Sequence, residues 1–152
     1  MTAQPTRLIA ATAIALAGIA APAPLAHAGE VRHKTTAICK SISPNVIDNP
    51  YAGRITTTQW LPKERGRITV VVAQSKSVFG YQNRPRLAWH NLTTGERGHA
   101  STISYSNLNA GAATFINIRT GSGRVTLKLR TYNSNKFWSL RSTACSATVR
   151  VR

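Results

Sequence analysis

Two histidines and a glutamate are the residues of this chain best suited to acid–base chemistry. His90, Glu96 and His99 lie close together, and the pattern of residues 87–105 predicts a hairpin that brings the two histidines near each other. Two imidazoles among arginines could act as base and acid in the cleavage of RNA, or could bind a metal ion together with Glu96. Because strand histidines are more often surface residues with an ordinary hydrogen bond, we assign no catalytic residue and no metal ligand.

The scarcity of acidic residues limits other chemistry. The chain has only 4 Asp and Glu residues: Glu30, Asp48, Glu64 and Glu96. That number excludes a calcium or magnesium cage of several carboxylates and leaves few choices for a catalytic carboxylate pair. Two cysteines are too few for a cysteine-rich zinc site, and the sequence has no nucleophile-elbow, HExxH or P-loop motif. We therefore expect a protein that is not an enzyme and that needs no cofactor.

The clearest functional pattern is an alternation of basic and apolar residues. It runs through residues 124–130 and again through 145–152. Side chains of a strand alternate between its two faces, so the apolar set of each segment should face the core and the basic set should face solvent. If the two strands share a sheet, five cations gather on its outer face as a predicted polyanion-binding site: Arg124, Lys128, Arg130, Arg150 and Arg152.

The overall charge also indicates an anionic partner. The 152 residues include 20 Lys and Arg, giving a formal net charge of +16, whereas about 2–8 charges keep a small domain soluble. Arginine, which can bind phosphate, carboxylate or sulfate with two hydrogen bonds, is well suited to such a partner. The predicted partner is an anionic polymer or an anionic cell surface. Nucleic acid stays open, because the basic and aromatic residues match no named nucleic-acid motif.

Two further features leave other functions open. Residues 75–85 are expected to form an irregular loop that ends in Arg84-Pro85-Arg86, which a secreted protease inhibitor could present to its target. Phe137 and Trp138 follow a polar segment and are the best candidates for an exposed stacking platform. The alternatives to polyanion binding are thus a protease inhibitor and a small secreted nuclease that uses His90 and His99.

The first 28 residues have the pattern of a secretory signal peptide. Arg7 precedes an uncharged apolar run over residues 8–21, and Ala26 and Ala28 form a small-residue cleavage site before Gly29. The run is shorter than the roughly 20 residues that span a bilayer, and no second run of that length follows. We expect a secreted, extracellular chain of residues 29–152 without a transmembrane segment.

The mature chain reads as a series of short strands joined by turns. The expected strands cover residues 35–41, 54–60, 68–73, 87–91, 100–105, 113–119, 124–132 and 142–152. Such a series predicts an all-β fold, a single antiparallel two-sheet sandwich of immunoglobulin-like architecture over residues 29–152. An even number of cysteines in an exported chain predicts one disulfide, between Cys39 and Cys145.

Overall fold

The computed structural model describes residues 29–33 and 37–152. They form strands and turns: β1 (Gly29–His33), β2 (Ile38–Ser41), β3 (Tyr51–Leu61), β4 (Arg67–Gln74), β5 (Tyr81–Asn91), β6 (Arg97–Ser101), β7 (Ser104–Ser106), β8 (Gly111–Arg119), β9 (Gly123–Ser134), β10 (Ser139–Arg141) and β11 (Cys145–Val151). Within these residues, no helix is long and apolar enough to cross a membrane. The expected signal peptide, residues 1–28, lies outside the described residues.

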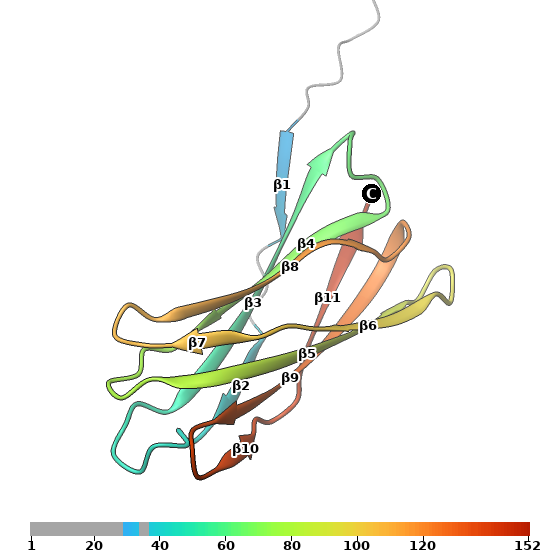
Figure 1. The fold of residues 1–152 in the computed structure, drawn as a ribbon. Coiled ribbons are helices and arrows are strands. Elements are labelled where there is room, and N and C mark those ends of the chain that lie inside the picture. Colours follow the sequence, from blue (N-terminus) through green and yellow to red (C-terminus); the bar gives the residue numbers. More distant parts are fainter. Residues whose placement is uncertain (1–28, 34–36) are drawn as a thin grey trace, which may run out of the picture.

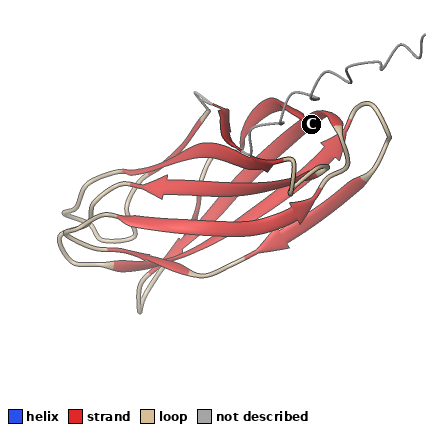
Figure 2. Cartoon of the chain, turned by 90° about the horizontal axis from the view of Figure 1, so that it is seen from above, coloured by secondary structure: helices blue, strands red, loops and turns tan. Residues whose placement is uncertain are grey.

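The strands form two antiparallel sheets that pack face to face (Figures 1 and 2). In the first sheet, β1 and β2 both pair with β3, which is followed by β4 and β8. In the second sheet, β6 and β7 both pair with β5, which is followed by β9, and β9 pairs with both β10 and β11. The predicted all-β, two-sheet sandwich is confirmed.

The core lies between the two sheets, and buried residues alternate with outward-facing residues along the strands. Every second residue of β4 and β9 is buried, because these residues point at the opposite sheet. The largest fully buried apolar side chains are Tyr51, Ile55, Ile68, Leu87, Leu127 and Leu129. Tyr51 also crosses the core, where its hydroxyl lies 2.9 Å from the Thr131 hydroxyl of the second sheet. Burial raises the pKa of Tyr51 to about 12, so this hydroxyl stays protonated at neutral pH.

A disulfide joins the two sheets at one edge. Cys39 lies on β2 of the first sheet and Cys145 on β11 of the second, with their Cα atoms 5.0 Å apart. The predicted Cys39–Cys145 pairing is confirmed.

The expectation of an irregular loop over residues 75–85 was wrong. Residues 81–85 belong to β5 rather than to an irregular loop, which leaves only residues 75–80 as a connection. Pro85 is tolerated inside this strand because it lies opposite the gap between β6 and β7, where its carbonyl accepts a hydrogen bond from Thr102 and no N–H is needed. Arg84-Pro85-Arg86 is therefore part of a sheet and is not an extended loop that a protease could bind.

The sheet edges are interrupted. In the described part of the chain, β1 and β2 divide one side of β3, β6 and β7 divide one side of β5, and β10 and β11 divide one side of β9. The remaining edge strand, β8, pairs with β4 through a register shift between Ile68 and Val70, and its Asn117 has a φ of 56°. Strands β1 and β10 were not predicted from the sequence.

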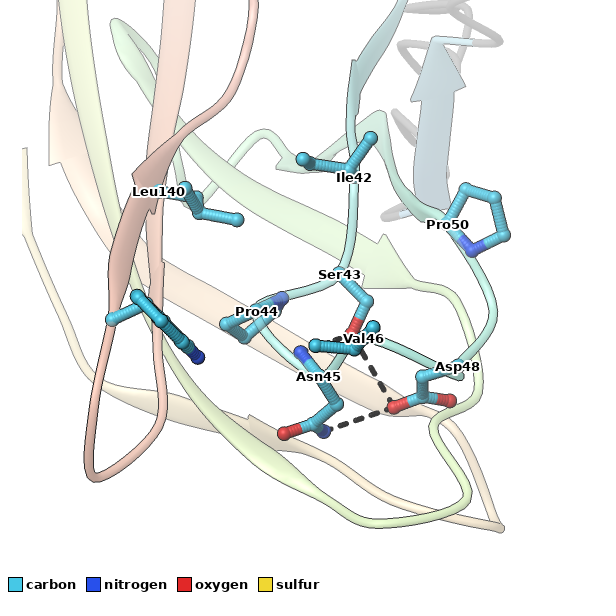
Figure 3. Close-up of a pocket in the computed structure, with 9 residues that line it drawn as sticks. Ile42, Ser43, Pro44, Asn45, Val46, Asp48, Pro50 and Leu140 are labelled. Carbon is cyan, nitrogen blue, oxygen red and sulfur yellow. Dashed lines mark hydrogen bonds between the residues drawn. The ribbon is translucent and has the colours of Figure 1, made fainter.

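At one end of the sandwich, the carboxylate of Asp48 accepts hydrogen bonds from Ser43 and Asn45 of its own loop (Figure 3) and from residues of the loop that follows β4. Its two oxygens accept hydrogen bonds from five groups: the hydroxyls of Ser43 and Ser77, the side-chain amide of Asn45, and the backbone N–H groups of Asn49 and Val78. Burial raises the pKa of Asp48, but hydrogen bonds from Asn45, Ser77, Val78 and Asn49 outweigh burial and lower the pKa to about 2. The carboxylate is therefore ionised wherever the protein is folded near neutral pH.

Replacing Asp48 by asparagine should destabilise the protein in a pH-dependent way. The asparagine side chain would place an NH₂ group where one carboxylate oxygen of Asp48 accepts hydrogen bonds. Losing these bonds should lower the free energy of unfolding by about 1–3 kcal/mol near neutral pH. Because the folded-state pKa is lowered from 3.8 to about 2, the stabilisation is fully present above about pH 4 and is lost as the pH falls through about 2. Thermal unfolding of wild type, Asp48→Asn and the control Glu96→Gln, measured between neutral pH and about pH 2, tests this prediction. A gap between wild type and Asp48→Asn that stays constant down to about pH 2 would contradict the assignment.

Candidate anion-binding face

The outer face of the second sheet brings together the basic residues of β9 and β11. The two strands are antiparallel neighbours, with Arg124 opposite Arg150 and Lys128 opposite Ser146. Val125 and Val149, which flank the first pair, are buried, so both arginines point outward. The expectation that these strands share a sheet is confirmed. Arg152 lies beyond the end of β11, where its backbone bonds to Gln59, and so it stands at the margin of the face.

Four further cations on this face were missed by the sequence analysis. Arg84 and Arg86 point outward from β5, Arg97 from β6 and Arg141 from β10. The alternation of Arg84 and Arg86 with Pro85 and Leu87 was the available sequence signal, but Pro85 argued against a strand. The basic face therefore comprises these residues: Arg84, Arg86, Arg97, Arg124, Lys128, Arg130, Arg141 and Arg150, with Arg152 at the margin.

Like charges lie directly opposite one another on the basic face. Arg124 faces Arg150 across β9 and β11, and Arg130 faces Arg86 across β9 and β5. Such pairs are destabilising unless a counter-charge lies between them. The acidic residues of the described ranges lie elsewhere: Asp48, Glu64 and Glu96 are in loops or turns, and Glu30 is on the first sheet. An anion from outside the chain would relieve this repulsion.

A shallow hollow of about 530 Å³ indents the middle of the basic face. The polar and basic side chains that line it are those of Arg86, His99, Ser101, Lys128, Arg130 and Tyr132. The Arg86 guanidinium stacks over the Tyr132 ring at 5.0 Å from its centroid, which orients the guanidinium. Arg130 is half-buried, and no acceptor in the described part of the chain bonds its Nε.

The two histidines lie on the basic face but are not directly opposite. β5 and β6 form the predicted hairpin, in which His90 faces Arg97 and His99 faces Ala88. The imidazoles are thus diagonal neighbours, and Glu96 lies in the turn. In residues 29–33 and 37–152, no group of three or more His, Cys, Asp or Glu residues could hold a metal ion. At this face the histidines can add hydrogen-bond donors to those of the arginines.

The aromatic pair expected to be exposed lies in the turn between β9 and β10. Phe137 is 82% exposed and Trp138 is 56% exposed. Both backbone N–H groups are held by the side-chain oxygen of Asn135, at 2.8 Å each. The pair therefore lies on an ordered turn, but at the end of the sheet rather than in the centre of the basic face.

Comparison with known proteins assigns no function to this arrangement. No protein-family model, no curated protein and no solved structure matches the chain at a significant level.

Proposed function

We propose that this chain is a secreted, non-enzymatic protein that binds anionic polymers or anionic cell-envelope material through the basic face. The observation that carries the proposal is the register of the second sheet. It sets Arg124 against Arg150 and Arg86 against Arg130, with the acidic residues of the described chain outside the face. A fold that keeps such pairs gains most when an external anion lies between them.

The spacing of the cations suits a linear polymer better than a single small anion. Outward residues on one strand repeat about every 7 Å, and neighbouring strands lie about 4.8 Å apart. Along β9, Lys128 and Arg130 are one such interval apart, and Arg124 and Lys128 are two intervals apart because Thr126 lies between them. Arg86 and Arg150 extend the row to both neighbouring strands. A chain of phosphate, sulfate or carboxylate groups can therefore contact several of them at once. The sheet holds the strands fixed, so little backbone entropy is lost on binding.

The proposal is tested by reversing charge on one sheet at a time. Arg124→Glu/Lys128→Glu changes two exposed strand cations of the basic face, and Arg54→Glu/Arg67→Glu changes two exposed strand cations of the first sheet. With a heparin-derived oligosaccharide, the first variant should bind about tenfold or more weaker than the second, since it loses contacts rather than net charge alone. Affinity measured at low and near-physiological salt should also show a flatter salt dependence for the first variant.

Equal losses of affinity in the two variants would mean that net charge alone attracts the polymer, and the localised site would be abandoned. Steady turnover of an RNA substrate by the wild type, abolished in His90→Ala, would instead overturn the non-enzymatic part of the proposal.

Secretion is the second part of this proposal, and the pattern of residues 1–28 and the structural disulfide support it. Protein exported by a host secretion pathway should begin at Gly29. Intact-mass measurement with and without a reductant checks both the cleavage and the disulfide, which adds two hydrogens when reduced. Exported material that still carries residues 1–28 would contradict the cleavage.

A further inference from the structure

Several loops lie together at one end of the sandwich, opposite the end that holds the C-terminus (Figure 1). Exposed apolar side chains gather on these loops. Four connections form this end: residues 42–50, 75–80, 107–110 and 135–138. The exposed apolar residues on them, here called the apolar end, are between 56% and 91% exposed: Ile42, Val46, Ile47, Val78, Phe79, Leu108, Phe137 and Trp138. So dense a group of projecting apolar side chains is unusual on a surface that faces only water.

Hydrogen bonds tie the four loops into one unit. The side-chain amide of Asn135 donates to the Pro44 carbonyl at 2.7 Å, and that of Asn45 donates to the Gly80 carbonyl at 3.2 Å. Asp48 binds the N–H of Val78, and the Ser77 N–H donates to the Asn107 carbonyl at 3.0 Å. The apolar side chains therefore project from ordered loops, which cannot simply fold inward to hide them.

The shape of the apolar end favours a fluid partner. Ile42, Val46 and Trp138 line a hollow of about 450 Å³ between two of the loops (Figure 3). Phe79 and Phe137 line a second hollow of about 700 Å³. A folded protein or a second copy of this chain would need matching projections to fill both hollows, because protein interfaces pack as densely as protein interiors. Lipid chains and headgroups adapt to such a surface.

The charges around the apolar end favour an anionic lipid surface. Lys76 and Lys136 are exposed on the same loops, and each basic residue near an anionic membrane surface adds about 1 kcal/mol to binding by its charge. Asp48, the one acidic residue in the sequence of these loops, is occupied by five hydrogen bonds. Trp138 has the amphipathic ring that is preferred at a membrane–water interface.

We propose that the apolar end inserts into the interface of an anionic lipid bilayer, with Val46, Ile47, Phe79 and Phe137 entering the upper acyl region and Lys76 and Lys136 contacting headgroups. This site is separate from the basic face and does not depend on polyanion binding there. Insertion from one end leaves the side of the sandwich, including the basic face, exposed to the aqueous phase.

The test is the binding of the mature protein to vesicles of phosphatidylcholine alone and of phosphatidylcholine with phosphatidylglycerol. The double variant Ile47→Ser/Phe137→Ser should bind the anionic vesicles about tenfold or more weaker than wild type, since two apolar side chains no longer leave water. The matched control is Ile116→Ser, which removes a side chain that is 76% exposed on β8, whereas that of Ile47 is 81% exposed. It should bind as wild type does. A blue shift of tryptophan emission on vesicle binding should disappear in Trp138→Phe.

Each other outcome has a definite meaning. Equal vesicle binding by wild type and Ile47→Ser/Phe137→Ser would overturn insertion, and equal binding to neutral and anionic vesicles would overturn the role of charge. Concentration-dependent dimers of the wild type that are lost in the double variant would assign the apolar end to self-association instead. The heparin-oligosaccharide affinity of the double variant should stay at the wild-type value, so failure here is distinguishable from failure of the proposed polyanion site.

Discussion

Removing the disulfide by the double substitution Cys39→Ala/Cys145→Ala should lower the free energy of unfolding by about 3–5 kcal/mol. The two cysteines are 106 residues apart, so the bond restricts most of the unfolded chain. It also links β2 to β11 across the gap between the sheets, at an edge where each of these strands has a neighbour on one side only. Urea unfolding followed by tryptophan fluorescence measures the loss.

Two comparisons make the disulfide experiment decisive. Wild type in reductant should unfold at nearly the same urea concentration as the double variant, because both lack the crosslink. Reduction of the disulfide should lower the free energy of unfolding of the wild type by more than any single surface substitution does. Such a substitution typically changes stability by about 0.5 kcal/mol or less. Identical midpoints for oxidised protein and double variant would show that the bond carries no stability.

Replacing Leu127 by alanine should cost about 2–5 kcal/mol of stability without altering the affinity of the folded protein for a polyanion. Leu127 is fully buried on β9, between Trp89 of β5 and Ala147 of β11. Truncation leaves a cavity between two sheets that cannot move together, because the disulfide and the Tyr51–Thr131 hydrogen bond hold their spacing. Thermal unfolding and oligosaccharide binding of the same preparation measure the two effects.

The neighbouring residue supplies the matched control. Lys128 follows Leu127 on the same strand, but its side chain is on the outer face. Lys128→Ala should change stability by about 0.5 kcal/mol or less and should weaken oligosaccharide binding. If Leu127→Ala and Lys128→Ala reduced both quantities alike, the separation of core face and binding face on β9 would be wrong.

The faces of individual strands were predictable because they depend on local alternation. The pattern in residues 124–130 placed Val125 and Leu127 inside and Lys128 outside, and the structure agrees. The same reasoning applies to any strand with one solvent-exposed face and one buried face. A shift of the strand register by one residue would bury its charged side chains. The disulfide followed from the number of cysteines and the expected compartment.

The neighbours of each strand were less predictable, because strand pairing joins residues far apart in the chain. Nothing near Arg130 in the sequence indicates that Arg86 lies opposite it. Arg84 and Arg86 were also obscured by Pro85, which normally argues against a central strand and fits here only because the facing edge is broken. Half of the basic face therefore became visible only with the register of the second sheet.

The apolar end was even less predictable from the sequence than the basic face. Phe137 and Trp138 stood out in the sequence, whereas Val46, Ile47 and Phe79 read as ordinary loop residues. Asp48 stood out in the sequence only as one of four acidic residues, although it binds donors from two separate loops. Clusters made from several loops have no signature in a single stretch of chain, because each loop contributes only one or two side chains.

Several edges of the two sheets are divided between two short strands, and this affects how closely packed copies of the protein can interact. A protein that binds a long polymer is brought close to many copies of itself, and strand-rich chains in that situation can join edge to edge through unpaired backbone groups. Here β7 and β10 have three residues each, β6 has five, and the edge strand β8 is bent by its register shift. The short strands thus offer only a short row of free N–H and C=O groups, and the longer edge strands are β8, with nine residues, and β11, with seven. Under the proposed polymer binding, the short edge strands would limit edge-to-edge pairing of neighbouring molecules.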